Sequence, residues 1–310
     1  MLNSIESLRE LLSGTFLSEA DMIQLDIPMT QSVALAIAVN LENSLAAWYL
    51  LKDLMPQTQR YPVITACWGS NGGNWQKTVN DEDFFSRFYF GEEYPNLDLS
   101  PEAIIARANS ISSQELDNFL DESARFNTYN LEEQIFTELA NTSSIFGIAP
   151  LISELQAIVR SGQISTIVDI EKYLFDWELQ HIADIPALSH QETTYLDWYQ
   201  PNGQTMALIL LPTPHSWETL AYLSWYGGSK MAIPLLQKWH QFYEADLVCH
   251  YGTMLQLLVG KRPSTPQEAF KLASEQVLLA PCTTLLSGVS IRDHARSLLK
   301  INRWFIHERP

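Results

Sequence analysis

A chain of 310 residues is long enough to build a conventional hydrophobic core, because folding buries about 75% of the surface that such a chain exposes when unfolded. Its 46% of hydrophobic and 18% of charged residues lie far from the composition of disordered chains. The formal net charge of −17 makes nucleic acid a poor partner, because phosphate backbones are bound through cationic contacts.

The sequence predicts neither a secretion signal nor a membrane span. Glu6 and Glu10 stand where a signal peptide needs a basic segment followed by an apolar run. The most apolar early stretch, 32–39, is far shorter than the roughly 20 residues of a spanning helix. The three cysteines are Cys67, Cys249 and Cys282. Because they are odd in number and widely separated, we expect reduced thiols and a cytoplasmic, soluble protein with no membrane partner.

The N-terminal part, residues 1–75, predicts two helices and one strand. Helical spacing of apolar residues predicts helices over 4–12 and 41–54, the second ending before Pro56. Residues 61–68 are rich in β-branched and aromatic side chains, which predicts a buried strand. We therefore expect residues 1–75 to contribute to an α+β domain.

Residues 76–189 predict an acidic helical insertion. Strand-like runs disappear there, and Ser100 followed by Pro101 is a typical helix start. The predicted helices cover 103–111, 115–126, 131–140, 150–160 and 166–182. Between Asn80 and Ala140 there are 14 acidic and 3 basic residues. This asymmetry favours a basic partner, although an acidic face can also serve solubility alone.

Residues 190–310 predict a C-terminal α+β domain. Strands predicted over 194–199 and 205–211 flank Asn202 and Gly203, a pair typical of a hairpin turn. Thr265, Pro266 and Glu268 form a helix start with a capping acid, so 266–279 is predicted to be helical. The other expected elements are helices over 217–226, 233–243 and 290–300, and strands over 246–250, 253–259 and 303–306.

Four stretches of the last third carry a family resemblance. They are PTPHSWE at 212–218, LLQKWHQFYEADLV at 235–248, KRPSTPQEAFKLASEQ at 261–276 and the terminal RWF at 303–305. Together they resemble the bacterial family called domain of unknown function 4253, over about residues 205–310, with a weaker echo over 42–68. The resemblance implies an α+β fold and no assigned activity. The chain departs from the pattern at 307–310, where relatives tend to end in tryptophans and an aspartate.

The polar residues of this region that are best suited to catalysis or metal binding are His215, Glu218, His240 and His250. Histidine and carboxylate can bind zinc or transfer protons where they converge, whereas capping and surface roles are the alternative. The chain has no phosphate-binding loop, no His-Glu-x-x-His, no Cys-x-x-Cys and no Gly-x-Ser-x-Gly. We therefore name weak catalytic candidates, but no metal and no cofactor.

Aromatic residues concentrate in the same region, and four of them are candidate binding residues. They are Trp217, Tyr226, Trp239 and Trp304. Tryptophan and tyrosine anchors dominate ligand grooves and partner-binding patches. The alternative is that most of them pack in the core.

The expected architecture is α+β, with a mixed, largely antiparallel sheet, flanking helices and an inserted acidic helical subdomain. The leading hypothesis is a non-catalytic intracellular protein-binding module of the inhibitor or immunity type, whose acidic surface meets a basic protein. The alternative is a metal-assisted hydrolase that uses the histidine and glutamate cluster, and a structural role is a third option. The partner's identity and the oligomeric state stay open.

Overall fold

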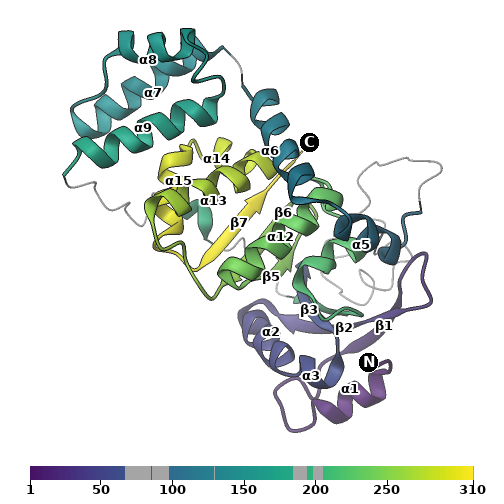
Figure 1. Cartoon of the computed structure of the whole chain (residues 1–310). Helices are drawn as coiled ribbons and strands as arrows, with labels where there is room; N and C mark the ends of the chain where they lie inside the picture. Colours follow the sequence, from purple (N-terminus) through teal and green to yellow (C-terminus); the bar gives the residue numbers. More distant parts are fainter. Residues whose placement is uncertain (67–84, 86–97, 129, 184–193, 198–204, 310) are drawn as a thin grey trace. The chain divides into compact units, whose positions relative to one another are not determined.

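The computed structural model describes residues 1–66, 85, 98–128, 130–183, 194–197 and 205–309 (Figure 1). The chain divides into two compact units. The first comprises residues 1–111, 197–261 and 302–310, and the second comprises residues 112–196 and 262–301. The domain boundaries expected at residues 75 and 189 lie outside the described residues. Residues 262–301, expected in the C-terminal domain, are in the second unit together with the acidic helices.

The first unit is built on a seven-stranded sheet with the strand order β1-β2-β4-β3-β5-β6-β7. The strands are β1 (Met22–Asp26), β2 (Val33–Asn40), β3 (Tyr61–Ala66), β4 (Thr205–Leu211), β5 (Ala245–His250), β6 (Met254–Val259) and β7 (Arg303–His307). Strands β3 and β5 are parallel, and the other neighbours are antiparallel. This confirms the predicted α+β fold with a mixed, largely antiparallel sheet.

Strand β4 lies between two strands from the N-terminal part of the chain. Leu208 pairs with Ile37 of β2 and with Ile64 of β3, and the strand is buried along almost its whole length. An apolar run of this kind is typical of a strand covered on both faces. The chain therefore joins segments far apart in sequence at the centre of its sheet.

The predicted strand over 194–199 was wrong for its described part, because Thr194–Leu196 forms the 3-10 helix η3. The expected turn at Asn202 and Gly203 lies outside the described residues. Both edges of β4 are occupied by β2 and β3, so long-range pairing decides its partners. Strands β1 and β2 were not predicted, and β2 is the short apolar run that is too short for a membrane span.

One face of the sheet packs against N-terminal helices. These are α1 (Ile5–Leu11), the 3-10 turn η1 (Leu41–Asn43), α2 (Ser44–Asp53) and α3 (Met55–Thr58). Leu8, Trp48 and Leu51 enter the core with side chains of β2, β3 and β4. The indole Nε1 of Trp48 donates to the carbonyl of Pro62 at 2.9 Å, which ties α2 to β3. The helices predicted over 4–12 and 41–54 are confirmed.

The aromatic core of the first unit lies between β7 and the long helix α12 (Ser229–Tyr243). The ring of Trp304 is 6.0 Å from that of Trp239 and 5.6 Å from that of Tyr243, both edge to face. Helix α5 (Pro101–Asn109), capped by Ser100 as predicted, packs against α12. Instead of one helix over 217–226, the chain forms η4 (Ser216–Glu218) and α11 (Thr219–Tyr222).

The second unit is helical. Its elements are α6 (Ser113–Phe126), α7 (Leu131–Phe146), α8 (Ile152–Arg160), α9 (Ile167–His181), η3, α13 (Pro266–Leu279), α14 (Cys282–Leu285) and α15 (Ile291–Leu298). The Thr265 side chain accepts from the backbone N–H of Glu268, so the predicted cap of α13 is confirmed. The apolar faces of α7, α8 and α9 share a small core that contains Ile135, Leu155 and Leu174. Among the described residues, no helix is both long and apolar enough to cross a membrane.

Replacing Trp239 with alanine should destabilise the first unit by about 3–5 kcal/mol, because the side chain is fully buried against Trp304. Urea denaturation measures this loss. Phe242→Ala on the same helix is the matched control, because that side chain is 62% exposed and its loss should change stability by about 0.5 kcal/mol or less. Equal effects of the two substitutions would contradict the described packing.

Candidate functional site

The stretch PTPHSWE forms a tight turn after β4. The hydroxyl of Thr213 accepts a hydrogen bond from the backbone N–H of His215 at 3.1 Å and donates one to the carboxylate of Glu218. The hydroxyl of Tyr222 donates to the carbonyl of Pro212. These bonds hold η4 against the end of β4, and Trp217 projects from it toward α12.

Three aromatic rings from this turn and from α12 contact one another in sequence. The rings of His215 and Trp217 are 4.5 Å apart and stacked, whereas the ring of His240 lies 4.9 Å from that of Trp217 and is tilted by 52°. His215 is exposed, whereas Trp217 and His240 are half-buried. The structure therefore brings three of the predicted site residues together at the surface of the first unit.

His240 also belongs to a charged cluster with Asp246 and Lys52. Glu244, in the left-handed conformation with φ of 52°, ends α12 and turns the chain into β5, which carries Asp246. The Nδ1 atom of His240 is 3.3 Å from Oδ1 of Asp246, and Nζ of Lys52 on α2 is 3.1 Å from Oδ2. Nζ of Lys52 also lies 4.6 Å from the ring centroid of the buried Tyr61. We call these three charged residues the Lys52–Asp246–His240 cluster.

Hydrogen bonding controls the protonation of this cluster. The bond to Asp246 raises the pKa of His240, against the opposing effect of partial burial. Burial alone would raise the pKa of Asp246, but its contacts with His240 and Lys52 hold it below the ordinary value. Nδ1 of His240 also donates to the carbonyl of Ala245 at 3.2 Å, and Nε2 makes no hydrogen bond within the described part of the chain. The ring of His240 is therefore held in one orientation, and its Nε2 atom can accept or donate a proton.

Of the four catalytic candidates, Glu218 and His250 lie outside both this cluster and the group of rings around Trp217. His250 is fully buried in β5, where its Nδ1 accepts from the N–H of Gly252 at 3.1 Å and burial lowers its pKa to about 3. Glu218 is bound to Thr213 in the turn. Within the described residues, no group of three or more His, Cys, Asp and Glu side chains could hold a metal ion.

The four aromatic binding candidates also separate. Trp239 and Trp304 are completely buried in the core, so they line no surface groove. Tyr226 donates its backbone N–H to Gly252 and is half-buried. Of the four, only Trp217 contacts His215 and His240. Sequence reasoning missed Asp246 and Lys52, because nothing in their local pattern indicates that α2 and β5 meet at the same end of the sheet.

The second unit presents a different kind of surface where α6 leads into α7. Its exposed charged and aromatic members are Asp117, Asp121, Glu122, Arg125, Phe126, Glu132, Glu133 and Phe136, which we call the α6–α7 surface. Phe126 is 78% and Phe136 is 58% exposed. Asp117, Asp121, Glu122 and Glu132 form no ion pair with any described residue. The hydroxyl of Thr128 accepts from the N–H of Ile167, which ties this junction to α9.

The model of a known protein family matches the segment that supplies β4 to β7 together with α12, α13 and α15. Residues 207–307 carry the domain of unknown function DUF4253. This confirms the resemblance predicted over about 205–310. The DUF4253 segment supplies His215, Trp217, His240 and Asp246, whereas Lys52 lies outside it. It also contributes to both compact units. Neither the curated proteins nor the solved structures contain a match to this chain.

Replacing Asp246 with asparagine should lower the pKa of His240, because a neutral amide no longer favours the charged imidazole. A titration followed by NMR of the imidazole protons between about pH 5 and 8 measures the shift. His250 is the internal control, because it is buried and should stay neutral across this range. An unchanged His240 titration in Asp246→Asn would contradict the described pairing.

Proposed function

We propose that the protein is a non-catalytic binding module that holds a basic partner protein on the α6–α7 surface, in the manner of an inhibitor or immunity protein. The observation that carries the proposal is the combination of unpaired carboxylates with exposed phenylalanines. Exposed charges of one sign steer a partner of the opposite sign, and aromatic side chains supply the buried anchors of an interface. The proposal places the protein in the cytoplasm, where Cys249 and Cys282 would stay reduced.

The acidic residues are arranged for a partner rather than for internal pairing. Asp117 and Asp121 lie four residues apart on α6, so they share one side of the helix, and Glu132 follows in the first turn of α7. Carboxylates four residues apart repel each other weakly, and a bound cationic side chain would relieve that repulsion. The two phenylalanines lie in the same stretch of chain, and their exposed rings gain most from burial by a partner.

We infer acid–base chemistry at His240 as a second candidate function, favoured by the Lys52–Asp246–His240 cluster. A carboxylate that holds Nδ1 fixes the ring and leaves Nε2 to accept or donate the proton. Lys52 keeps the carboxylate ionised through its contact with the other oxygen. The metal-assisted hydrolase, the alternative from the sequence, would require some of His215, Glu218, His240 and His250 to converge, and only His215 and His240 contact the same ring, that of Trp217.

An arginine-rich amphipathic peptide should bind the full-length protein with an affinity that falls as salt rises, because exposed charge pairs are screened. Asp117→Lys with Asp121→Lys should weaken binding by about tenfold or more. The matched control is Glu10→Lys with Glu19→Lys, which changes net charge equally at exposed positions of the first unit. Titration calorimetry measures both. An affinity that does not depend on salt concentration, or an equal loss of affinity in both double variants, would overturn the proposed surface.

The second candidate predicts slow hydrolysis of an activated ester such as p-nitrophenyl acetate, because a neutral imidazole Nε2 can take a proton from water. His240→Gln should reduce the rate to that of buffer, whereas the control His215→Gln should keep it. Treatment with a chelator should leave the rate unchanged if no metal takes part. Equal rates in the wild type and His240→Gln would rule out His240 as the acid–base group.

A further inference from the structure

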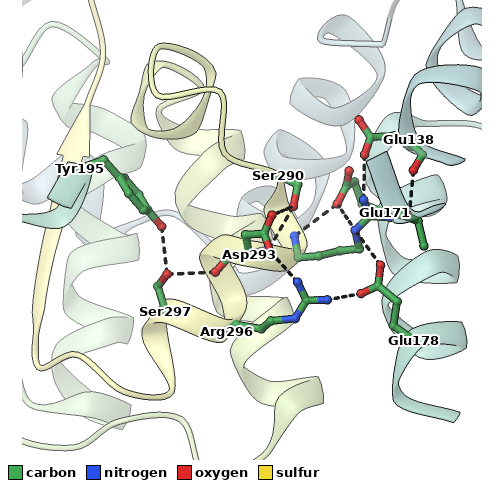
Figure 2. Close-up of polar contacts among 10 residues, drawn as sticks. Glu138, Glu171, Glu178, Tyr195, Ser290, Asp293, Arg296 and Ser297 are labelled. Atoms are coloured by element: carbon green, nitrogen blue, oxygen red, sulfur yellow. Dashed lines mark hydrogen bonds and ion pairs between the residues drawn. The ribbon is translucent and has the colours of Figure 1, made fainter. Parts of the chain in front are cut away.

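The second unit contains a buried network of charged side chains that joins three helices (Figure 2). Arg292 on α15 contacts Glu138 of α7 through Nη2 at 2.8 Å. Its Nε atom is 3.3 Å from Glu171 and 3.5 Å from Glu178, both on α9. Arg296, one turn further along α15, pairs with Glu178 and Asp293. The network therefore links the DUF4253 segment to two helices of the acidic insertion.

Burial makes the charges of this network costly unless they balance. Arg292 and Glu171 are each 3% exposed, and Glu178 is 1% exposed. The carboxyl groups of Glu138, Glu171, Glu178 and Asp293 outnumber the two guanidinium groups. An uncompensated charge in such a place costs several kcal/mol, so a proton on one of the buried carboxyl groups stabilises the network by reducing the excess of negative charge. This excess of carboxyl over guanidinium groups follows from the contacts alone.

The contacts identify where the proton lies. The carboxyl groups of Glu138 and Glu171 both face the guanidinium of Arg292, Glu138 at 2.8 Å from Nη2 and Glu171 at 3.3 Å from Nε. Two carboxylates held against one buried guanidinium repel each other, and a proton on one of them relieves that repulsion, as in carboxyl dyads that share a proton. Glu171 also accepts the backbone N–H of Arg292 at 3.2 Å, in the first turn of α15. One shared proton thus stabilises contacts among α7, α9 and α15.

The charged neighbours of Glu171 come from each helix of the network. Glu138 faces it from α7, Glu178 lies two turns along α9 itself, and Arg292 faces it from α15. Asp293 and Arg296 belong to the network through Glu178, with which Arg296 pairs, and lie further from Glu171. The nearby His294 does not titrate in the same range, because full burial lowers its pKa to about 3.

We propose that the proton shared by Glu138 and Glu171 is a lock that holds α7 and α9 against α15, and that its loss loosens these helices and weakens partner binding at the α6–α7 surface. The regulatory part rests on the proposed function. Helix α7 connects the two, because Glu138 points to the network while Glu132, Glu133 and Phe136 of the same helix are exposed. A change in the packing of α7 therefore reaches the binding surface directly.

The sign of the pH dependence follows from burial. Desolvation raises the pKa of Glu171 to about 8, although Arg292 acts in the opposite direction. Because the folded-state pKa lies above the ordinary value of 4.5, the stabilising contribution is complete below about pH 4.5 and is lost as pH rises to about 8. The lock is therefore closed in mild acid and open in mild alkali.

Hydrogen exchange of the full-length protein, followed by mass spectrometry, tests the lock. After correction for intrinsic exchange, the opening constant of α7 and α9 in the wild type should rise by up to about tenfold per pH unit between about pH 5 and 8. Glu171→Gln keeps a donor for Glu138 and cannot ionise, so its opening constant should lack this rise. Asp176→Asn is the matched control, because that half-buried carboxylate of α9 pairs with Lys172 outside the network. Helix α2 of the first unit is the internal reference.

Binding of the arginine-rich peptide is the second readout, because arginine stays charged throughout this range. Wild-type affinity should fall as pH rises, and Glu171→Gln should bind equally at both ends. If the wild type and Glu171→Gln show the same pH dependence of exchange in α7 and α9, the lock is overturned, whatever the peptide does. If the exchange results hold but the peptide binds at no pH, the lock stands, and the regulatory part falls with the proposed function.

Discussion

The buried guanidinium of Arg292 is the interaction on which the helical unit most depends. It is surrounded by glutamates from two other helices, and each of those carboxyl groups would be costly to bury without it. Removing such a partner from a buried network leaves an unpaired charge behind, whereas removing a partly exposed pair such as Lys172 and Asp176 changes the stability little. The apolar core of α7, α8 and α9 supplies bulk stability, and the arginine determines which helix packs against them.

The two units use similar chemistry under different degrees of burial. In the Lys52–Asp246–His240 cluster a carboxylate lies between two basic groups near the surface, so His240 keeps a raised pKa and remains able to titrate. His294 in the second unit is fully buried between the hydroxyl of Tyr195 and the side-chain oxygen of Gln276, and it stays neutral. Burial and the nature of the partner, rather than residue type, decide which histidines can change charge.

The DUF4253 segment does not form a separate domain in this chain. Its strands complete a sheet whose centre also needs β2 and β3 from the N-terminal part. In the second unit its helix α13 packs against α6 and its helix α15 packs against α9, and Tyr195 of η3 hydrogen-bonds to His294 of α15. The helices of residues 112–196 therefore share the second unit with part of the DUF4253 segment, and Glu171 and Glu178 pair with the arginines of α15.

The sequence by itself determined the α+β class, the family resemblance and most helix positions, because capping residues and apolar spacing act within a few residues of chain. It also singled out His215, Trp217 and His240. Only the tertiary structure decided that Lys52 and Asp246 join His240, that Trp239 and Trp304 are core, and that Arg292 meets three glutamates. Those contacts join residues many positions apart, so they depend on how strands and helices pack, which local pattern does not encode.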